Sequence, residues 1–250
     1  HASDTVIYGF SHTHLSGTGC SDYGDILVMP VSGDVKLKDY DYASSFRKSD
    51  EKASPGYYKV FLGKDKITAE LTATTRTGFH KYTYSSEEQA GIVFDLKHRD
   101  KVLSSGIKIT GPDEIEGFRI SQAWASRQIV YFVARFSKPI KTFKLSSNDT
   151  LYYDIKELNS TNIKSLFTFD CSKQEPILVK VGISGVSIEG ARLNLESELP
   201  GWDFDKVKDQ ASEAWNQALG KIKTEHESID RKTAFYTALY HTMLQPNIYS

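Results

Sequence analysis

Apolar and polar residues alternate over much of the first 184 positions of the chain. The clearest case begins at Ile67, where Ile67, Ala69 and Leu71 fall on one face of an extended segment and threonine and glutamate separate them. A period of two residues is typical of a half-buried β-strand. Other short segments of strand-like composition recur at near-regular intervals, at 57–62, 79–84, 91–96, 129–134 and 177–183. Many short strands predict a β-sandwich or a barrel-like sheet.

Two further signals refine this expectation. The run from Ile129 to Ala134 is almost wholly apolar, which predicts a strand in the middle of a sheet. Pro55-Gly56 and Thr77-Gly78 precede two of the segments, and such dipeptides predict turns between strands. The pattern therefore predicts a mainly β domain over residues 1–186.

The hydrophobic period changes near residue 187. A short helix is expected over 187–198, ended by Pro200-Gly201, and Asp203 and Asp205 are suitable N-terminal caps for a second helix. In this second helix the apolar residues recur every three or four positions, at Val207, Ala211, Trp215, Ala218 and Ile222. That spacing predicts an amphipathic helix with one face against the rest of the molecule.

A third helix is expected from about Ser228 to Leu244, and its second half is apolar nearly all round. Such a helix is normally buried on several sides. Because three helices cannot surround it, we expect the chain to be the opening part of a longer protein, with hydrophobic surface exposed. The expected division is a sandwich at 1–186, a helical linker at 187–227 and the first helix of a further domain at 228–250.

The composition narrows the possible partners. The 250 residues include 31 Lys and Arg against 32 Asp and Glu, for a formal net charge of -1. This balance argues against nucleic acid or an anionic membrane as a partner. No apolar run approaches the roughly 20 residues of a membrane-spanning helix, and no signal peptide is visible in the sequence. Cys20 and Cys171 fit either two free thiols or one disulfide.

The segment 9–26, with the sequence GFSHTHLSGTGCSDYGDI, has the densest candidate chemistry. It contains two histidines, two aspartates and four glycines. Glycine allows a positive φ or a close backbone approach, and histidines and acids beside such turns suit a polar ligand site. The alternative is a self-satisfied turn between two strands, with the histidines hydrogen-bonded to local backbone.

Several long motifs follow one another along the chain. They are GFSHTHLSGTGCSDYGDI from Gly9, LTATTRTGFHKYTY from Leu71, IEGFR from Ile115, VKVGIS from Val179, EGARLNLE from Glu189, PGWDFD from Pro200 and FYTALYHT from Phe235. In content and order they resemble glycoside hydrolase family 92, the calcium-dependent exo-acting α-mannosidases. The resemblance implies an N-terminal β-sandwich (a super-sandwich), linker helices and an (α/α)6 barrel that this chain lacks.

Members of that family remove terminal α-linked mannose with inversion, in an active site between sandwich and barrel. Inversion needs a carboxylic acid and a carboxylate base about 6.5–9.5 Å apart. In the family both belong to the barrel. We therefore expect no catalytic acid, base or calcium ligand in this chain, and no activity from it alone. Calcium is expected only in the complete enzyme.

The resemblance makes segment 9–26 the expected sandwich side of the sugar site. The expected substrate-binding residues are His12, His14, Thr18, Gly19 and Asp22. His12 and His14 share a face of an extended segment and would donate hydrogen bonds to mannose hydroxyls. Thr18 and Gly19 would let the backbone approach the sugar.

Other conspicuous residues favour structural roles. Asp25 is expected to cap a turn. His80 is expected to be a satisfied structural histidine on a strand, and His241 a buried, hydrogen-bonded residue that faces the barrel. Trp124 and Trp202 fit core or interface area better than sugar platforms.

The expected function is therefore the N-terminal part of an exo-α-mannosidase, with α-1,2-linked mannose, as in N-glycan processing, as the expected target. Its partners would be a mannose-containing glycan and the C-terminal barrel. The resemblance implies a periplasmic, cell-surface or secreted location. Two alternatives stay open, a stand-alone carbohydrate-binding module and a purely structural domain that packs on a barrel. The uncovered third helix argues against the module.

Overall fold

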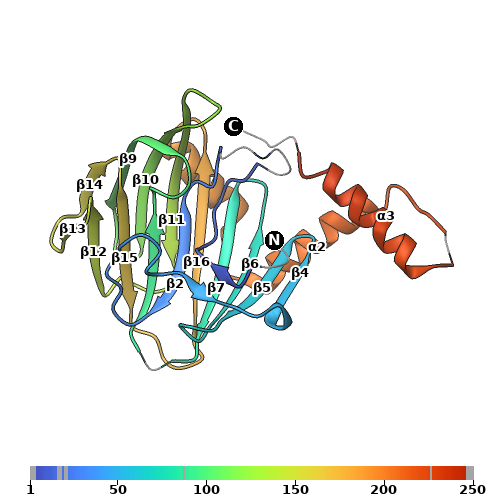
Figure 1. The fold of residues 1–250 in the computed structure, drawn as a ribbon, viewed down its shortest axis with the longest axis horizontal. Coiled ribbons are helices and arrows are strands. Elements are labelled where there is room, and N and C mark those ends of the chain that lie inside the picture. The colour runs from blue at the N-terminus through green and yellow to red at the C-terminus, as the bar shows by residue number, and fades with distance from the viewer. Residues whose placement is uncertain (1–3, 16–18, 20–21, 87, 226, 246–250) are drawn as a thin grey trace.

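Two antiparallel β-sheets stacked face to face form the body of the protein (Figure 1). The computed structural model describes residues 4–15, 19, 22–86, 88–225 and 227–245. The β-sandwich predicted from the alternation of apolar residues is therefore confirmed.

In the described part of the chain the larger sheet has nine strands in the order β14-β9-β10-β11-β16-β7-β6-β5-β4. Their bounds are β4 Glu51–Ser54, β5 Tyr57–Leu62, β6 Ile67–Ala73, β7 Thr77–Tyr84, β9 Lys101–Ile109, β10 Glu114–Gln122, β11 Gln128–Phe136, β14 Glu157–Ser160 and β16 Pro176–Ser184. The interior position of β11 agrees with its apolar sequence.

The smaller sheet has five strands among the described residues, in the order β13-β12-β15-β8-β2. Their bounds are β2 Leu27–Ser32, β8 Ala90–Asp95, β12 Thr142–Ser147, β13 Thr150–Tyr152 and β15 Ile163–Phe169. A separate short pair joins β1 Val6–Ile7 to β3 Ser44–Ser45, and a 3-10 turn, η1, covers Lys48–Asp50.

Phenylalanines from both sheets form the centre of the core. Phe94 of β8 lies 6.1 Å, ring centroid to centroid, from Phe132 of β11. Phe136, also on β11, lies 4.9 Å from Phe169 and 5.8 Å from Phe167, both on β15. All five rings are fully buried. Offset and edge-on aromatic pairs add to the apolar burial that holds the two sheets together.

The helices begin where the sequence predicts them. Their bounds are α1 Ile188–Glu198, α2 Phe204–Leu219 and α3 Ile229–Thr242. The N-cap residues are Ser187, Asp203 and Ser228, and each side chain accepts a hydrogen bond from a backbone N–H in the first turn. These bonds satisfy donors that a helix start otherwise leaves unpaired.

The alternation that begins at Ile67 fails at the end of β6. Thr72 is buried and donates to the carbonyl oxygen of Gly56 (2.7 Å), whereas Leu71 is only half-buried. The reason is that α2 packs against β5, β6 and β7. On the same side of the sheet, Phe79 of β7 packs with Phe204 at the start of α2. Both faces of the sheet are therefore covered at this end, and a simple inside–outside pattern cannot hold there.

The turn expected at Thr77-Gly78 lies earlier in the chain. The backbone N–H of Thr74 donates to the carbonyl oxygen of Thr77 (2.9 Å), and Thr77 already begins β7. Gly78 is therefore inside a strand, where glycine normally weakens the sheet and indicates a close approach by another group.

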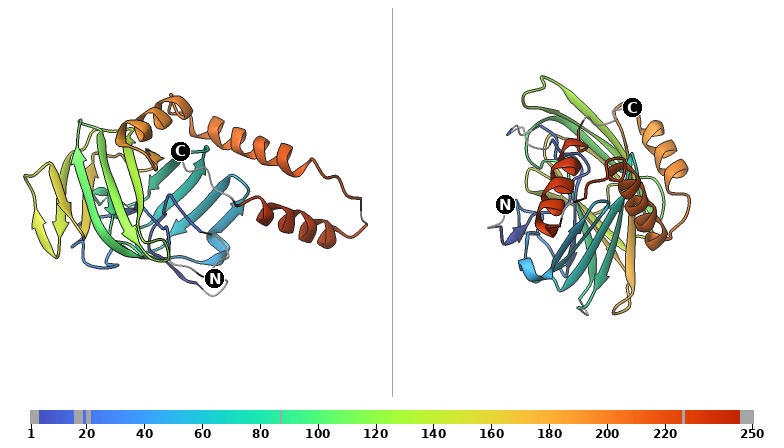
Figure 2. Two further views of the ribbon diagram at one scale, coloured as in Figure 1. Left: turned by 90° about the horizontal axis from the view of Figure 1, so that it is seen from above. Right: turned by 90° about the vertical axis from the view of Figure 1, so that its right-hand side faces the viewer.

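Helix α2 starts on the larger sheet and projects past its end, and α3 runs back toward the sandwich, as Figure 2 shows from above. Along α3, whose residues are all described, no side chain is buried, and Ile229 is 79% exposed. The expected hydrophobic exposure is confirmed. His241 is exposed in this chain, so its burial against a barrel stays a prediction.

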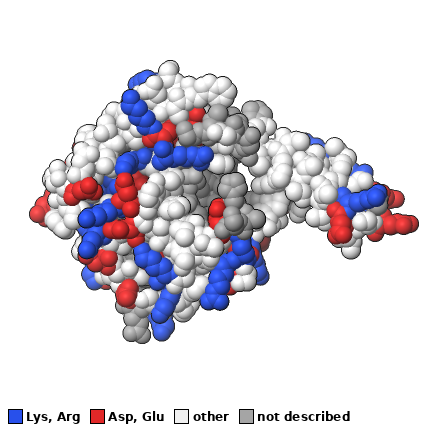
Figure 3. Space-filling model, in the orientation of Figure 1, with Lys and Arg blue, Asp and Glu red and all other residues white. Residues whose placement is uncertain are grey.

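Acidic and basic side chains are interspersed on the face of the molecule seen in Figure 3. None of the helices in the described ranges has the length and apolar character of a membrane-spanning helix. Cys171 is a half-buried free thiol whose pKa is raised by burial, and Cys20 lies outside the described residues.

Lys180 joins the sandwich to the segment between α1 and α2. This lysine, on β16, is only 3% exposed. Its Nζ donates to the carbonyl oxygen of Leu199 (2.8 Å) and lies 4.0 Å from the ring centroid of Trp202. Burial lowers the pKa of Lys180 to about 8, with a further contribution from Arg135. The ammonium is still mostly protonated at pH 7, so it can hold one face of Trp202 by a cation–π interaction.

Replacing Lys180 by methionine tests this joint, because methionine keeps the apolar stem and removes the charge. We expect Lys180→Met to lower the free energy of unfolding by about 1–3 kcal/mol, from the lost hydrogen bond and cation–π contact. Urea unfolding measures the change, and limited proteolysis should become faster near residues 199–203. The matched control is Lys52→Met on the exposed edge strand β4. Equal stability of the two variants would contradict the assignment.

Candidate functional site

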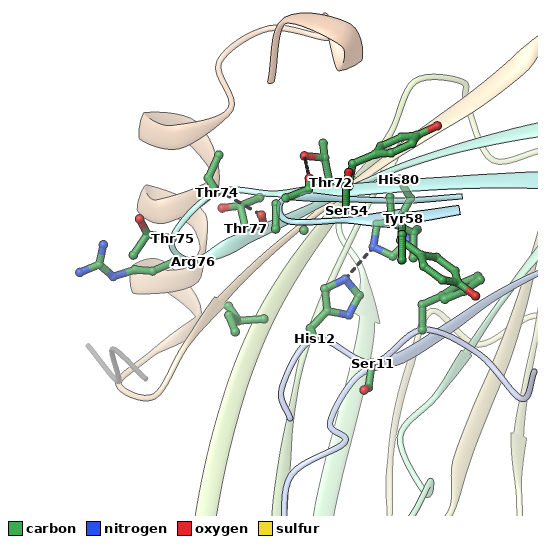
Figure 4. A pocket seen from close by; sticks show the side chains of 18 of the residues that line it. Ser11, His12, Ser54, Tyr58, Thr72, Thr74, Thr75, Arg76, Thr77 and His80 are labelled. Atoms are coloured by element: carbon green, nitrogen blue, oxygen red, sulfur yellow. Dashed lines mark hydrogen bonds between the residues drawn. The ribbon is translucent and has the colours of Figure 1, made fainter. Parts of the chain in front are cut away.

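A cavity of about 420 Å³ lies between the segment around His12, the strands β5 to β7 and the end of α3. Figure 4 shows His12 beneath these strands, with Thr74, Thr75 and Arg76 at the tip of the β6–β7 hairpin. The lining combines side chains with hydroxyl groups, at Ser11, Ser54, Tyr57, Tyr58, Thr72, Thr74, Thr75, Thr77 and Tyr240, with the apolar Phe10, Leu71 and Ile183. A concave site of this volume and mixed character suits a small hydroxylated ligand.

The floor of the cavity is a chain of hydrogen bonds through two histidines. His12 Nδ1 lies 2.7 Å from the carbonyl oxygen of Ile26, and His12 Nε2 lies 2.9 Å from His80 Nε2. His80 Nδ1 lies 2.6 Å from the hydroxyl of Tyr82. A carbonyl can only accept, so His12 Nδ1 carries the proton. His80 must then donate through Nε2, and Tyr82 donates to His80 Nδ1.

The charge state of the pair agrees with this pattern. Burial lowers the pKa of His12 to about 4, although the hydrogen bond to Ile26 acts in the opposite direction. Burial, with the nearby His12, lowers the pKa of His80 well below its ordinary value. Both rings are therefore neutral near pH 7, as the hydrogen-bond chain requires.

These hydrogen bonds define the role of each histidine. His80 is buried with both ring nitrogens bonded inside the protein, so the expected satisfied structural histidine is confirmed. The ring nitrogens of His12 are also both engaged, and the N–H expected to reach a sugar hydroxyl instead donates to Ile26. With both nitrogens bonded inside the protein, His12 contributes a fixed ring to the cavity lining.

Gly78 is necessary for the ring of His12 to lie where it does. A Cβ atom at position 78 would lie 2.7 Å from His12 Cδ2 and 2.9 Å from His12 Nε2. Both distances are shorter than a carbon side chain tolerates. Sequence reasoning took this glycine as part of a turn and missed the close approach.

The backbone opposite His12 is folded tightly. Tyr23, Gly24 and Ile26 have φ values of 68°, 89° and 54°. The left-handed region is unusual for a β-branched residue such as Ile26 and indicates local strain. The strained peptide orients the Ile26 carbonyl toward His12.

Asp22 and Asp25 fix this segment to other parts of the sandwich. The Asp22 carboxylate accepts hydrogen bonds from the backbone N–H groups of Ala125 (2.8 Å) and Trp124 (3.1 Å), which lower its pKa. Asp25 is fully buried and forms an ion pair with Arg119. Its other carboxylate oxygen accepts from Thr13 Oγ1 (2.8 Å) and from Gln128 Nε2 (3.1 Å).

The expected turn-capping role of Asp25 is therefore wrong, because Arg119 and Gln128 belong to β10 and β11. The tryptophan beside Asp22 is also not part of the core, since Trp124 is 80% exposed. The carboxylates of Asp22 and Asp25 both accept hydrogen bonds from protein donors on each of their oxygens. Within the described ranges, no group of three His, Cys, Asp or Glu side chains is placed to hold a metal ion.

Only part of the expected substrate-binding set lies at the cavity. His12 lines it. His14 is exposed and its backbone pairs with Tyr23, and Gly19 is exposed with a φ of 70°. Neither of these two, nor Asp22, is among the described lining residues. Thr18 lies outside the described residues.

The largest group of lining residues that the sequence did not predict comes from the β6–β7 hairpin. Glu198 of α1 holds this tip, since its carboxylate accepts from Thr74 Oγ1 and from the backbone N–H (2.9 Å) and Nη1 (3.3 Å) of Arg76. The sequence feature that indicates this hairpin is a series of threonines, which continues beyond the alternating part of β6.

Two family descriptions match the chain in succession. The N-terminal domain of glycosyl hydrolase family 92 matches residues 1–184, and the catalytic domain of the same family matches residues 190–250. The β-sandwich with a cavity beside the first helices is thus that of a glycoside hydrolase. The chain belongs to glycosyl hydrolase family 92.

Relatives of known structure agree with this assignment. A family 92 α-mannosidase from Bacteroides thetaiotaomicron is 32% identical, with a TM-score of 0.93 over 100% of this chain and 35% of that chain. An inverting mannosidase of the family from the same organism is 25% identical, with a TM-score of 0.89 over 98% of this chain and 33% of its own. An uncharacterized secreted glycosidase of Arthroderma benhamiae is 25% identical, over 98% of this chain and 36% of its own length. The chain thus spans about a third of each relative.

Acid is expected to break the His12–His80 hydrogen bond, because protonated His12 would direct an N–H at the N–H of His80. Both histidines have folded-state pKa values below the ordinary 6.5, so the folded state binds fewer protons than the unfolded state. Stability should therefore fall as the pH drops from about 6.5 to about 4, where His12 titrates in the folded state. Thermal unfolding between pH 7 and pH 4 measures the loss.

The comparison for this test is the double variant His12→Gln/His80→Gln, which should lose less stability over the same range. Some loss will remain, because burial also lowers the pKa of His98. An equal loss in both proteins would show that the pair does not titrate as described.

Proposed function

We propose that this chain is the N-terminal part of an exo-acting, inverting α-mannosidase, and that the cavity beside His12 is the sandwich side of its mannose site. The observation that carries the proposal is the position of this cavity. Its lining includes residues of the β6–β7 hairpin, His12 and Tyr240 of α3, so it lies where the sandwich meets the helices that open the catalytic domain. The named activity of the solved relatives supports the same class of substrate.

In this proposal the chain binds and orients the sugar, and it does not break the glycosidic bond. An inverting hydrolase needs one carboxylic acid and one carboxylate with room for water between them. Carboxylates bonded to residues around the cavity are committed elsewhere. Asp25 pairs with Arg119, Glu198 binds the hairpin tip, and Glu70 and Glu51 accept from the hydroxyls of Tyr57 and Tyr58. The acid and the base would come from the rest of the catalytic domain, as would the ligands of calcium. The described residues include no group of three acidic, His or Cys side chains that could hold calcium.

The roles proposed for the expected binding residues follow from their positions. His12 would form a rigid wall against the apolar C–H face of the sugar ring. His14 and Gly19, both exposed, would lie at the rim of the site. Thr18 stays an expected binding residue. Asp22 would act indirectly, since its bonds to residues 124 and 125 hold the segment in place.

Residues 1–186 would be the sandwich, 187–227 the linker and 228–250 the start of an (α/α)6 barrel that packs against them. The substrate would be terminal α-linked mannose on a glycan, with α-1,2 linkage and N-glycan processing as the specific expectation. A periplasmic, cell-surface or secreted location is supported by the relative described as secreted.

Substitutions at Gly78 and His12 test the site in the full-length enzyme. Gly78→Ala should displace the His12 ring, and His12→Ala should remove it. Each is expected to lower kcat/KM on α-1,2-mannobiose by roughly tenfold or more, which corresponds to about 1.4 kcal/mol of transition-state binding. The matched control is Gly111→Ala, because a Cβ at that position meets only ordinary contacts, at 3.7 Å or more. Unchanged kinetics in both site variants would remove the sugar-wall role.

Calcium dependence and stereochemistry test the assigned reaction. The full-length enzyme is expected to lose activity on α-mannosides after dialysis against a chelator and to regain it with added Ca²⁺. Proton NMR of the first product should show β-mannose, as inversion requires. The 250-residue chain alone should release no mannose. Activity unaffected by chelation, or α-mannose as the first product, would contradict the proposal.

A further inference from the structure

We propose that Asp25 and Arg119 are positioning residues that hold His12 in the cavity, so that an ion pair inside the sandwich sets the geometry of the sugar site. The kinetic part of this inference rests on the proposed function. The structural part, that the ion pair determines the state of the His12 ring, does not.

Arg119 lies on β10 and has no exposed surface. Its Nε donates to the carbonyl oxygen of Leu96 (2.8 Å), and its Nη2 donates to that of His98 (2.8 Å) and to the Asp100 carboxylate. Its Nη1 donates to the Asp25 carboxylate. The guanidinium therefore ties the segment 96–100 to the segment that carries Asp25. A planar cation with donors in fixed directions is suited to such a junction.

Asp25 transmits this position to His12 through the backbone. The carbonyl oxygen of Asp25 accepts the backbone N–H of His12 (2.9 Å), and the next carbonyl, that of Ile26, accepts His12 Nδ1 (2.7 Å). The N–H of Asp25 donates to Thr13 Oγ1 (2.9 Å), and the same hydroxyl donates back to the Asp25 carboxylate (2.8 Å). Two bonds of His12 thus end on the peptide groups that the Asp25 side chain anchors.

The backbone around Asp25 needs this anchor because of its conformation. Tyr23 and Ile26 hold positive φ values, which non-glycine residues adopt only when the surroundings enforce them. Without the ion pair, the strained backbone at Ile26 would relax to a more favourable φ. The Ile26 carbonyl would then turn away from His12. The His12 ring would then be free to change its tautomer and its bond to His80.

A buried ion pair can also be merely structural, and such pairs often stabilise a fold no better than apolar groups. The two roles predict different results. A structural role lowers stability wherever the network is cut. A positioning role alters the His12 ring only when the cut is on the Asp25 side.

The experiment compares Asp25→Asn with Asp100→Asn in the full-length enzyme. Both carboxylates are buried and both pair with Arg119, but only Asp25 bonds to the segment that holds His12. Nitrogen-15 NMR of labelled histidine reports the protonation of each His12 nitrogen, and the signal is assigned by its loss in His12→Gln.

We expect Asp25→Asn to shift the His12 signals toward a mixture of tautomers and to lower kcat/KM by roughly tenfold. Asp100→Asn should leave the His12 signals in place and kcat/KM within about twofold of wild type. If Asp25→Asn does not fold, Thr13→Val provides a milder cut, since it removes the hydroxyl that clamps Asp25.

The outcomes separate the inference from the proposed function. Unchanged His12 signals in Asp25→Asn and in Thr13→Val would overturn the positioning role, as would equal shifts in Asp25→Asn and Asp100→Asn. A shift confined to the Asp25 side, with unchanged kinetics, would support the positioning role and count against His12 as part of the sugar site.

Discussion

The buried guanidinium of Arg119 links the two sheets by hydrogen bonds and ion pairs, in addition to the apolar core that they share. Arg119 lies in the larger sheet. It bonds to the segment that follows β8 and to the segment that precedes β2, and β8 and β2 are strands of the smaller sheet. A charge without exposed surface is tolerated only when its donors are satisfied. The bonds to Asp25 and Asp100 meet that need and fix the relative position of the two sheets at this end.

The second constraint comes from the helices. The inner face of the larger sheet packs on the smaller sheet. Its outer face is covered in part by α1 and α2, which bury residues of β7, β11 and β16 from that side. Ala191 and Leu195 of α1 pack against Val133 of β11, and Gly182 of β16 lets α1 approach closely. Helix α1 and the start of α2 therefore form two small apolar clusters on the outer face of the larger sheet, apart from the core between the sheets. The cavity beside His12 depends on α1 because Glu198 holds the hairpin that lines it.

The elements of the fold could be predicted from the sequence because their signals are local. A period of two residues, a period of 3.6 and N-cap residues such as Ser187 act within a few positions of the chain. The contacts of the site are not local. His12 bonds to His80, 68 positions away, and Asp25 to Arg119, 94 positions away. No spacing rule links such pairs, and Gly78 looks like a turn residue until the ring of His12 is placed against it.

The chemistry of the site follows from how completely its charges are satisfied. The two histidines are neutral and bonded to each other, and the nearby carboxylates are bonded to Arg119, Arg76 or backbone N–H groups. The described lining consists of hydroxyl-bearing and apolar side chains, Arg76 and the fixed rings of the two histidines. Such a surface can hold a neutral polyhydroxylated ligand by shape and by numerous weak contacts, but the described lining includes no carboxylate to act as acid or base on the ligand. Under the proposed function, catalysis therefore begins only where α3 and the helices that follow it complete the cavity, and the rigidity of His12 is what this chain contributes to it.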